Sequence, residues 1–324
     1  MMRVFDLHCD TISVLAEKGS SLRNGETAVS LFRAEKMLGN AMKTDRDKEH
    51  HSAYVQCFAL FSKEDDGAKG AALWDALYAV FSEQMRRFSD AILQADSYRG
   101  IQAAIEDGKI CALLTAENGS VFGDRLERIA QLRKAGCLAA ALTWNGKNAL
   151  GGGAMCPESG LSAFGKEAVR EMERCGMLAD ISHLSDRSVG DFLKVSSSPF
   201  LATHSCCRRK TPEARNLPDE YIVEMISRKS LLGVNFYKQF IRNPISGEAG
   251  IREIVDHMAH ILELGGRDIL ALGSDFDGAD MPDALAGVDR MEVLRDAVKK
   301  RFGEELAEKI FFTNAMDFFR RSFS

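Results

Sequence analysis

The chain begins with a short apolar segment that ends in a His-x-Asp pair. The segment Arg3–Cys9 reads RVFDLHC, and Asp10 follows it directly. Because side chains alternate along a strand, His8 and Asp10 are expected on the same face, where the strand stops. An imidazole and a carboxylate are typical ligands of zinc and similar divalent ions. A single pair of this kind more often belongs to a turn or a helix cap than to a metal site, so its interpretation depends on the rest of the chain.

Further ionisable and polar side chains follow six other apolar segments. In chain order they are Glu117, Trp144 with Asn145, His183, His204, Asn235 with Tyr237, and Asp275 with Asp277. Burying so many ionisable groups together without an ion would cost several kcal/mol. We therefore predict a metal site whose ligands are His8, Asp10, Glu117, His183 and His204.

These five groups are more than one tetrahedral zinc ion uses. A carboxylate can bridge two ions about 3.5–4 Å apart, and such a pair can hold and activate a water molecule. The residues alone therefore predict a binuclear metal hydrolase. Asp275 remains outside the ligand set and is available as a proton shuttle.

The chain must contain elements that bring these positions together. Eight apolar segments alternate with helical ones: Arg3–Cys9, Ala53–Phe61, Ile110–Ala116, Cys137–Thr143, Gly176–Ile181, Pro199–Thr203, Ser230–Phe236 and Asp268–Gly273. Near-continuous apolar runs are typical of strands buried on both faces, and their alternation with helices implies parallel βαβ units. We predict an α/β fold, a (β/α)8 TIM barrel with insertions, as a single metal-dependent hydrolase domain over residues 1–324. The metal site would lie at the C-terminal mouth of the barrel.

A doubly wound open sheet is the alternative fold. Such a sheet would usually gather its ligand residues at one crevice, whereas here polar residues end nearly every strand.

Helices are predicted at Thr11–Lys18, Gly70–Gln94, Arg125–Ala135, Gly165–Arg174, Asp186–Lys194, Pro218–Ser227, Ile251–Leu264 and Arg290–Phe319. The segment before His51 is polar and charge-mixed, and its stretch Lys43–His51 is expected to be a mobile loop.

The composition excludes some partners. The formal net charge is −5 and no long basic tract occurs, which argues against nucleic acid and against an anionic membrane surface. No apolar run approaches the roughly 18 residues of a membrane span, and no signal peptide is evident. The eight cysteines form no CxxC pair, as expected for free thiols in a reducing compartment. We therefore expect a cytoplasmic protein.

Seven motifs, spread along nearly the whole chain, resemble those of the membrane (renal) dipeptidase family, the M19 metallopeptidases. They are DLHCDT at 6–11, AEN at 116–118, GMLADISHLS at 176–185, THS at 203–205, RNLPDE at 215–220, VNFY at 234–237 and GSDFDG at 273–278. The resemblance implies a (β/α)8 barrel with two zinc ions. One ion would be held by His8 and Asp10 and the other by His183 and His204, with Glu117 bridging both.

The resemblance also implies roles in substrate binding. Arg215 would bind the C-terminal carboxylate of the substrate, for which a guanidinium fork is well suited. Asp275 would contact the substrate amine and carry a proton to the leaving nitrogen. Tyr237 is predicted to line the pocket because of its position, and Asp277 is predicted to brace the eighth loop.

One position departs from the family pattern. Many relatives carry His in a Leu-Thr-His motif after the fourth strand, where it is thought to stabilise the oxyanion, whereas this chain has Leu142-Thr143-Trp144-Asn145. Either Trp144 or Asn145 supplies the missing donor, or zinc alone polarises the carbonyl. Loss of such a donor costs about 2.7–4 kcal/mol in other enzymes.

The predicted function is a zinc-dependent dipeptidase, in which a metal-bridging hydroxide attacks the peptide bond of a dipeptide. A C-terminal D-residue would be tolerated by analogy with the family. Mn²⁺ or Co²⁺ could occupy the same ligands, and a homodimer is expected from relatives. The alternatives are another metal-dependent amidohydrolase of the deacetylase, lactonase or deaminase type, and a catalytically weak metal-binding relative. Amidohydrolases of these other types commonly carry His-x-His on their first strand, whereas this chain has His-x-Asp. Only the presence of Trp144 supports a catalytically weak relative.

Overall fold

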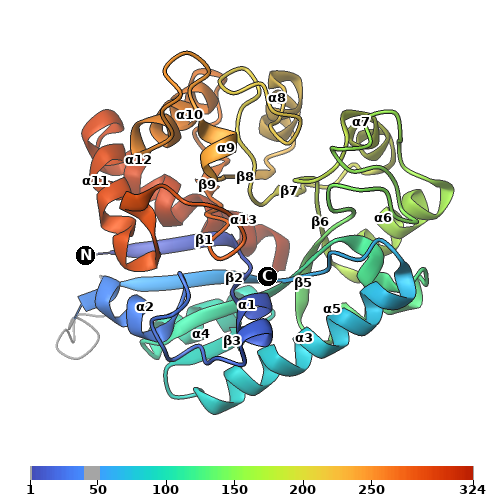
Figure 1. The fold of residues 1–324 in the computed structure, drawn as a ribbon, viewed down its shortest axis with the longest axis horizontal. Coiled ribbons are helices and arrows are strands. Elements are labelled where there is room, and N and C mark those ends of the chain that lie inside the picture. Colours follow the sequence, from blue (N-terminus) through green and yellow to red (C-terminus); the bar gives the residue numbers. More distant parts are fainter. Residues whose placement is uncertain (1, 40–51, 324) are drawn as a thin grey trace.

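A computed structural model describes residues 2–39 and 52–323, and its centre is a closed barrel of parallel strands (Figure 1). The barrel strands are β1 (Arg3–Cys9), β2 (Ala53–Phe61), β4 (Ile110–Glu117), β5 (Cys137–Ala141), β6 (Leu178–Asp180), β7 (Leu201–Ala202), β8 (Leu231–Val234) and β9 (Leu270–Leu272). Each pairs in parallel with its neighbours, and the pairings β1–β9 and β2–β4 close the ring. The predicted (β/α)8 barrel is confirmed, and the open sheet is excluded.

One strand was not predicted. The helix expected at Gly70–Gln94 is α3 (Gly67–Arg87), and the last four residues before Asp96 form β3 (Ile92–Ala95) instead. β3 pairs with the first half of β4, and β5 pairs with the second half of the same edge. The prediction of helix up to Gln94 was therefore wrong, because pairing with β4 and burial of Ile92 and Ala95 decide the conformation of this short segment.

The remaining helices surround the barrel. They are α1 (Thr11–Lys18), α2 (Leu31–Leu38), α4 (Tyr98–Glu106), α5 (Glu127–Lys134), α6 (Ala163–Cys175), α7 (Asp186–Val195), α8 (Asp219–Ser227), α9 (Lys238–Ile241), α10 (Ile251–Glu263), α11 (Met291–Phe302), α12 (Glu304–Glu308) and α13 (Asn314–Phe323). The expected continuous tail at Arg290–Phe319 is thus broken, and a π-helical turn, Lys309–Thr313, precedes α13. The expected mobile stretch Lys43–His51 lies outside the described residues. The described part of the polar segment contains α2.

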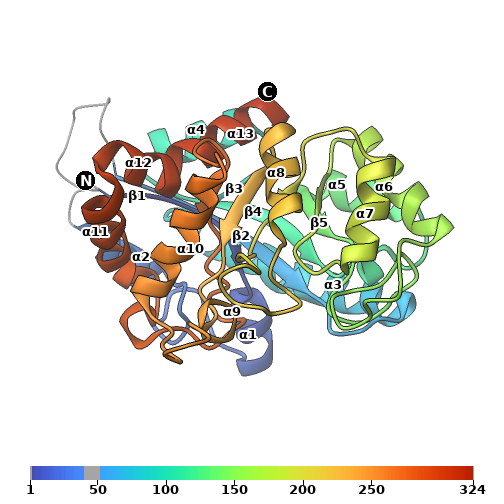
Figure 2. The same cartoon turned by 90° about the horizontal axis from the view of Figure 1, so that it is seen from above.

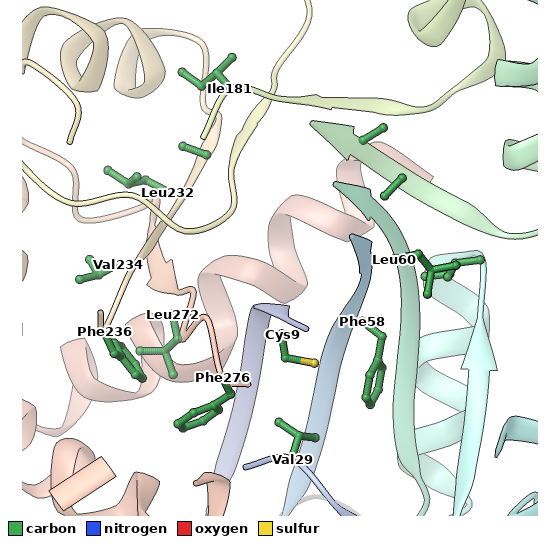
Figure 3. Packing of buried hydrophobic residues seen from close by; sticks show 14 of the residues in the cluster. Cys9, Val29, Phe58, Leu60, Ile181, Leu232, Val234, Phe236, Leu272 and Phe276 are labelled. Atoms are coloured by element: carbon green, nitrogen blue, oxygen red, sulfur yellow. The ribbon is translucent and has the colours of Figure 1, made fainter. Parts of the chain in front are cut away.

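Two apolar clusters fill the spaces on either side of the strands. The outer cluster packs strands against helices, as in the contact of Phe58 with Phe81 of α3, and it includes Cys9 and Phe276 (Figure 3). The inner cluster joins side chains from strands all around the barrel with those of α13. Phe5 lies 5.0 Å from Phe319, between ring centroids. Helix α13 therefore closes the N-terminal end of the barrel, opposite α1 and α9 (Figure 2).

An irregularity in β1 determines where His8 points. Leu7 belongs to the inner cluster and Cys9 to the outer one, although strict alternation would place both on the same face. The register of β1 against β2 shifts between Asp6 and Cys9. A shift of this kind re-aims side chains next to functional sites. It allows His8 to face the mouth of the barrel directly after Leu7.

Candidate metal centre and its cavity

The five predicted metal ligands meet at the C-terminal mouth of the barrel. All five are buried, although they come from five different segments, at the ends of β1, β4, β6 and β7 and at the start of α1. Glu117 lies at the centre of the group. Its Oε1 is 2.6 Å from Nε2 of His183, and its Oε2 is 3.4 Å from Nε2 of His8. The two oxygens of one carboxylate therefore face two different histidines.

Three overlapping sets of ligand atoms could each hold a metal ion. They are His8 with Asp10 and Glu117, Glu117 with His183 and His204, and His8 with His204 and Asp275. Within each set all ligand atoms lie within 4.8 Å of one another. The first two sets share Glu117, which is the arrangement that a bridging carboxylate requires.

The electrostatics of the cluster are dominated by burial and by the charges of its own members. Burial, together with the charge of Glu117, raises the pKa of Asp10 to about 8. Burial lowers the pKa of His183 to about 4 and that of His204 well below its usual value. Burial acts in the same direction on His8, but the charges of Glu117 and Asp10 outweigh it and raise its pKa. His183 and His204 are therefore neutral at pH 7, as metal ligands must be.

The donor set fits a divalent cation. Oδ1 of Asp10 is buried and has no hydrogen-bond partner among the described residues. Nε2 of His183 lies 2.8 Å from Nε2 of His204 and close to Glu117, so several acceptor atoms face the same small space. An unpaired buried carboxylate oxygen is costly, and imidazole and carboxylate together suit zinc and similar ions.

The second ring nitrogens of two histidines have partners outside the cluster. Nδ1 of His204 lies 2.8 Å from Oγ1 of Thr203, which donates to Asp180 at 2.5 Å. Nδ1 of His183 lies 2.9 Å from Oδ1 of Asn145. Such partners orient metal-binding imidazoles. Sequence reasoning did not identify Thr203 or Asp180; an acid inside a buried strand, three residues before His183, was the available signal.

Asp275 lies at the edge of the ligand cluster. Its Oδ1 is 3.9 Å from Nε2 of His8, and its Oδ2 accepts a hydrogen bond from Nδ2 of Asn235 at 2.9 Å. Its backbone has φ +65°, a region that Asp and Asn tolerate better than most residues. Gly278 follows closely, and a Cβ there would lie 2.0 Å from Asp10 and 2.6 Å from Asp275. The glycine therefore allows the loop to approach both carboxylates.

Arg215 lies on the other side of the cluster. Its Nη2 is 3.1 Å from Nε2 of His183, and its guanidinium lies 5.3 Å from the ring centroid of Phe240. Nε and Nη1 are buried without a hydrogen-bond partner among the described residues. The neighbouring Asn216 donates to backbone carbonyls of Thr211 and Phe240, which fixes the loop. Arg215 thus presents unpaired N–H donors in a preorganised position.

These residues surround one cavity of about 640 Å³. Trp144, Asn145 and Tyr237 line it, together with Asp275 and four of the five predicted ligands, namely Asp10, Glu117, His183 and His204. Trp144 contacts Phe61 edge-on, with 5.2 Å between ring centroids, so the two form an aromatic wall. Sequence reasoning missed Phe61 as a lining residue, and its place at the C-terminal end of a barrel strand was the available signal.

Asp277 links the eighth loop to the N-terminal segment. Its carboxylate accepts hydrogen bonds from Oγ1 of Thr11 at 2.6 Å and from the backbone N–H groups of Ala28 and Val29 at 2.7 and 3.3 Å. It also has positive φ, +68°. The bracing role expected of Asp277 agrees with these contacts.

The chain is similar to curated dipeptidases over parts of their length. It is 34% identical over 205 residues to an uncharacterized dipeptidase of Schizosaccharomyces pombe, which is 62% of this chain and 49% of that protein. It is 28% identical over 275 residues to the dipeptidase tcpJ of Claviceps purpurea, which is 82% of this chain and 64% of that protein. The matches thus span half to two-thirds of these relatives.

Every helix within residues 2–39 and 52–323 is too short or too polar to cross a membrane.

Solved structures with the same fold cover almost the whole chain. A dipeptidase AC, a metallopeptidase of family M19, has a TM-score of 0.89 at 22% identity, with 99% of both chains covered. A metallopeptidase from Rhodobacter sphaeroides, liganded with a phosphinate mimic of the dipeptide L-Ala-D-Ala, has a TM-score of 0.88 at 21% identity and the same coverage. The model of the membrane dipeptidase family matches residues 1–322. The chain therefore belongs to the membrane dipeptidase family, peptidase family M19.

Proposed function

We propose that this protein is a metal-dependent dipeptidase that hydrolyses the peptide bond of free dipeptides. The observation that carries the proposal is the placement of two opposite charges beside one ligand cluster. Arg215 lies next to His183, and Asp275 lies next to His8. A substrate with a carboxylate at one end and an amine at the other matches this pair. Recognition of both ends restricts the substrate to two residues.

The ligand set suits two zinc ions, and Mn²⁺ or Co²⁺ could take their place. His8 and Asp10 would hold one ion, His183 and His204 the other, and Glu117 both. When bound, such ions lower the pKa of a water molecule and polarise a carbonyl group. The protein's own contribution is to hold the ligands in a buried, preorganised cluster, which makes Glu117 part of the catalytic machinery.

Two further residues act on the substrate in this proposal. Arg215 binds the free carboxylate through the N–H groups that have no protein partner. Asp275 receives a proton from the attacking water and transfers it to the leaving nitrogen. Asn235 orients the Asp275 carboxylate through the bond to Oδ2. Tyr237 and Trp144 form walls of the same cavity and would contact substrate side chains.

The mimic of L-Ala-D-Ala bound by the Rhodobacter sphaeroides relative supports a substrate with a C-terminal D-residue. Family membership makes a dipeptidase preferable to a lactonase or deacetylase. We retain three further predictions: a single hydrolase domain over residues 1–324, a cytoplasmic location and a homodimer.

The test combines metal analysis with substrate assays. We expect about two zinc ions per chain and hydrolysis of L,L or L,D dipeptides that stops when a chelator is added. N-acyl amino acids and lactones, assayed in parallel, should not be cleaved. Bound metal with cleavage of only these alternatives would reassign the reaction, and bound metal without any turnover would favour a catalytically weak relative. Absence of bound metal under metal-replete conditions would contradict the proposal at its first step.

A further inference from the structure

The hydrogen-bonding partners of His183 determine which of its ring nitrogens carries the proton. Nη2 of Arg215 lies 3.1 Å from Nε2, and a guanidinium can only donate. Oε1 of Glu117 and Nε2 of His204 lie 2.6 and 2.8 Å from the same nitrogen, so Nε2 faces the space between the ligands, where a metal ion would require its lone pair. The proton of the neutral ring must then be on Nδ1. Oδ1 of Asn145, 2.9 Å away, is the acceptor for that N–H.

The two histidines of this metal set are supported differently. Nδ1 of His204 is backed by a hydroxyl and, behind it, by the buried carboxylate of Asp180. For His183 the only hydrogen-bond partner of Nδ1 among the described residues is the amide of Asn145. Loss of that amide should therefore affect one imidazole selectively.

The backbone around Asn145 is held rigidly. Its carbonyl accepts a hydrogen bond from the N–H of Met155 at 2.9 Å, and the N–H of Ala154 donates to the carbonyl of His183 at 2.8 Å. One short segment therefore ties Asn145 and His183 to each other. A Cβ at Gly153 would lie 1.9 Å from the carbonyl oxygen of Trp144, so the close approach of these two loop segments requires glycine there. The side chain of Asn145 is thus preorganised.

The orientation of this amide leaves its nitrogen free. Because Oδ1 faces His183, Nδ2 is directed elsewhere, and no acceptor for it exists among the described residues. Asn145 lines the cavity that contains the ligand cluster. Its N–H groups are therefore available to an oxygen of a bound substrate.

We propose that Asn145 has two functions: its Oδ1 is the positioning group of His183, and its Nδ2 donates a hydrogen bond to the carbonyl oxygen of the scissile peptide bond. The second function rests on the proposed dipeptidase activity, while the first does not. The pair of functions explains how a chain with Trp144 at the usual His position would retain a donor at the reacting carbonyl.

The first function is tested by metal binding, without substrate. Asn145→Ala should weaken the binding of one Co²⁺ ion about 10–100-fold in competition with a chelator, and should leave the other ion unaffected. Asn145→Asp restores an acceptor and should return the affinity to near that of the wild type. Asn148→Ala is the matched control, because that amide lies in the same loop but bonds to backbone groups and to Asn118. Wild-type affinity in Asn145→Ala, or a loss in Asn145→Asp equal to that in Asn145→Ala, would overturn the positioning role.

The second function is tested by turnover at saturating metal. Asn145→Asp should then hold both ions but lose kcat on the order of 10²–10³-fold, because a carboxylate cannot donate. Trp144→Phe, which removes the indole donor, should bind metal normally and lose far less kcat. The reverse order of the two losses would assign the donor to Trp144 and overturn this half. Wild-type turnover of the same dipeptides is measured in parallel. If the wild type does not cleave them, the dipeptidase proposal fails, and this outcome is distinct from a failure of the donor role of Asn145.

Discussion

Nε2 of His183 and Nε2 of His204 lie 2.8 Å apart, in a space that also contains an oxygen of Glu117. Burial keeps both rings from taking up a second proton at neutral pH. Two lone pairs and a carboxylate oxygen therefore face one another. A cation between them would make this arrangement of electron-rich atoms favourable. The geometry of these two residues is the main structural indication of a metal centre.

Metal removal should accordingly destabilise the protein. Ligands that bind only the folded state stabilise it by about 4 kcal/mol at a concentration 1,000 times Kd. We expect chelation to lower the Tm by several degrees and zinc to restore it, as measured by calorimetry. An identical Tm with and without chelator, in a sample shown to have lost its metal, would contradict this prediction.

Asp275→Asn should separate catalysis from folding. Asn tolerates the φ of +65° at this position and can still bond to Asn235, so fold and metal content should be unchanged. Proton transfer is lost, and kcat should fall about 10²–10⁴-fold. Metal analysis and steady-state kinetics on one preparation measure both quantities. Retained turnover would remove the shuttle role from Asp275.

Arg215→Ala should impair recognition of the substrate carboxylate. Hydrogen bonds to charged groups contribute about 1.5–3 kcal/mol, so kcat/KM for free dipeptides should fall roughly 10–150-fold. C-terminal dipeptide amides lack the carboxylate and serve as the control, because their kcat/KM should change much less. Equal losses on both substrate types would show that Arg215 does not bind the carboxylate.

Asp277→Asn should weaken the connection between the eighth loop and the N-terminal segment of the chain. The new amide nitrogen cannot accept the hydrogen bonds that one carboxylate oxygen now receives from Thr11 and Val29. We expect a loss of about 1–3 kcal/mol in the free energy of unfolding by urea, together with weaker metal binding at His8 and Asp10. Thr11→Val, which removes one of these donors, should show a smaller loss. Unchanged stability in Asp277→Asn would mean that the contacts are not structural.

His257 should contribute to acid sensitivity. It is buried on α10, it accepts a hydrogen bond from the N–H of Cys207 at 3.0 Å, and burial lowers its pKa to about 3. Between pH 6.5 and 3 the unfolded chain binds a proton there that the folded protein does not. Stability should therefore fall as the pH falls through this range, by at most about 1.4 kcal/mol per pH unit.

The check is a series of urea unfolding curves at pH 7, 6 and 5 for the wild type and His257→Gln. Gln can accept the same hydrogen bond but does not titrate, so its pH dependence should be flatter. Far-UV circular dichroism at pH 7 controls for correct folding of the variant. Parallel slopes in both proteins would contradict the prediction.

The sequence predicted the parts of this structure that depend on local pattern. Eight apolar segments and the residues that follow them were sufficient for the barrel and for the set around Glu117, because a barrel brings all C-terminal strand ends together. β3 was missed because a four-residue strand has little periodicity of its own, and its pairing with β4 decides its conformation.

The supporting contacts could not be predicted in the same way. Asn145 and His183 are 38 positions apart, and nothing in either motif specifies that Oδ1 of one meets Nδ1 of the other. The same is true of Asn235 and Asp275, whose contact depends on the angles at which two neighbouring strands end. Such pairs are fixed by tertiary packing, which a single sequence does not reveal.

The contact between Thr11 and Asp277 also has a consequence in time. It spans 266 positions, and β1 meets β9 in the same region. A ribosome adds roughly 5–20 residues per second, so His8 and Asp10 wait roughly 13–53 s before the loop that braces them has been made. The fifth ligand, His204, is made before β9, and the barrel that holds all five ligands together can close only after β9 has been translated.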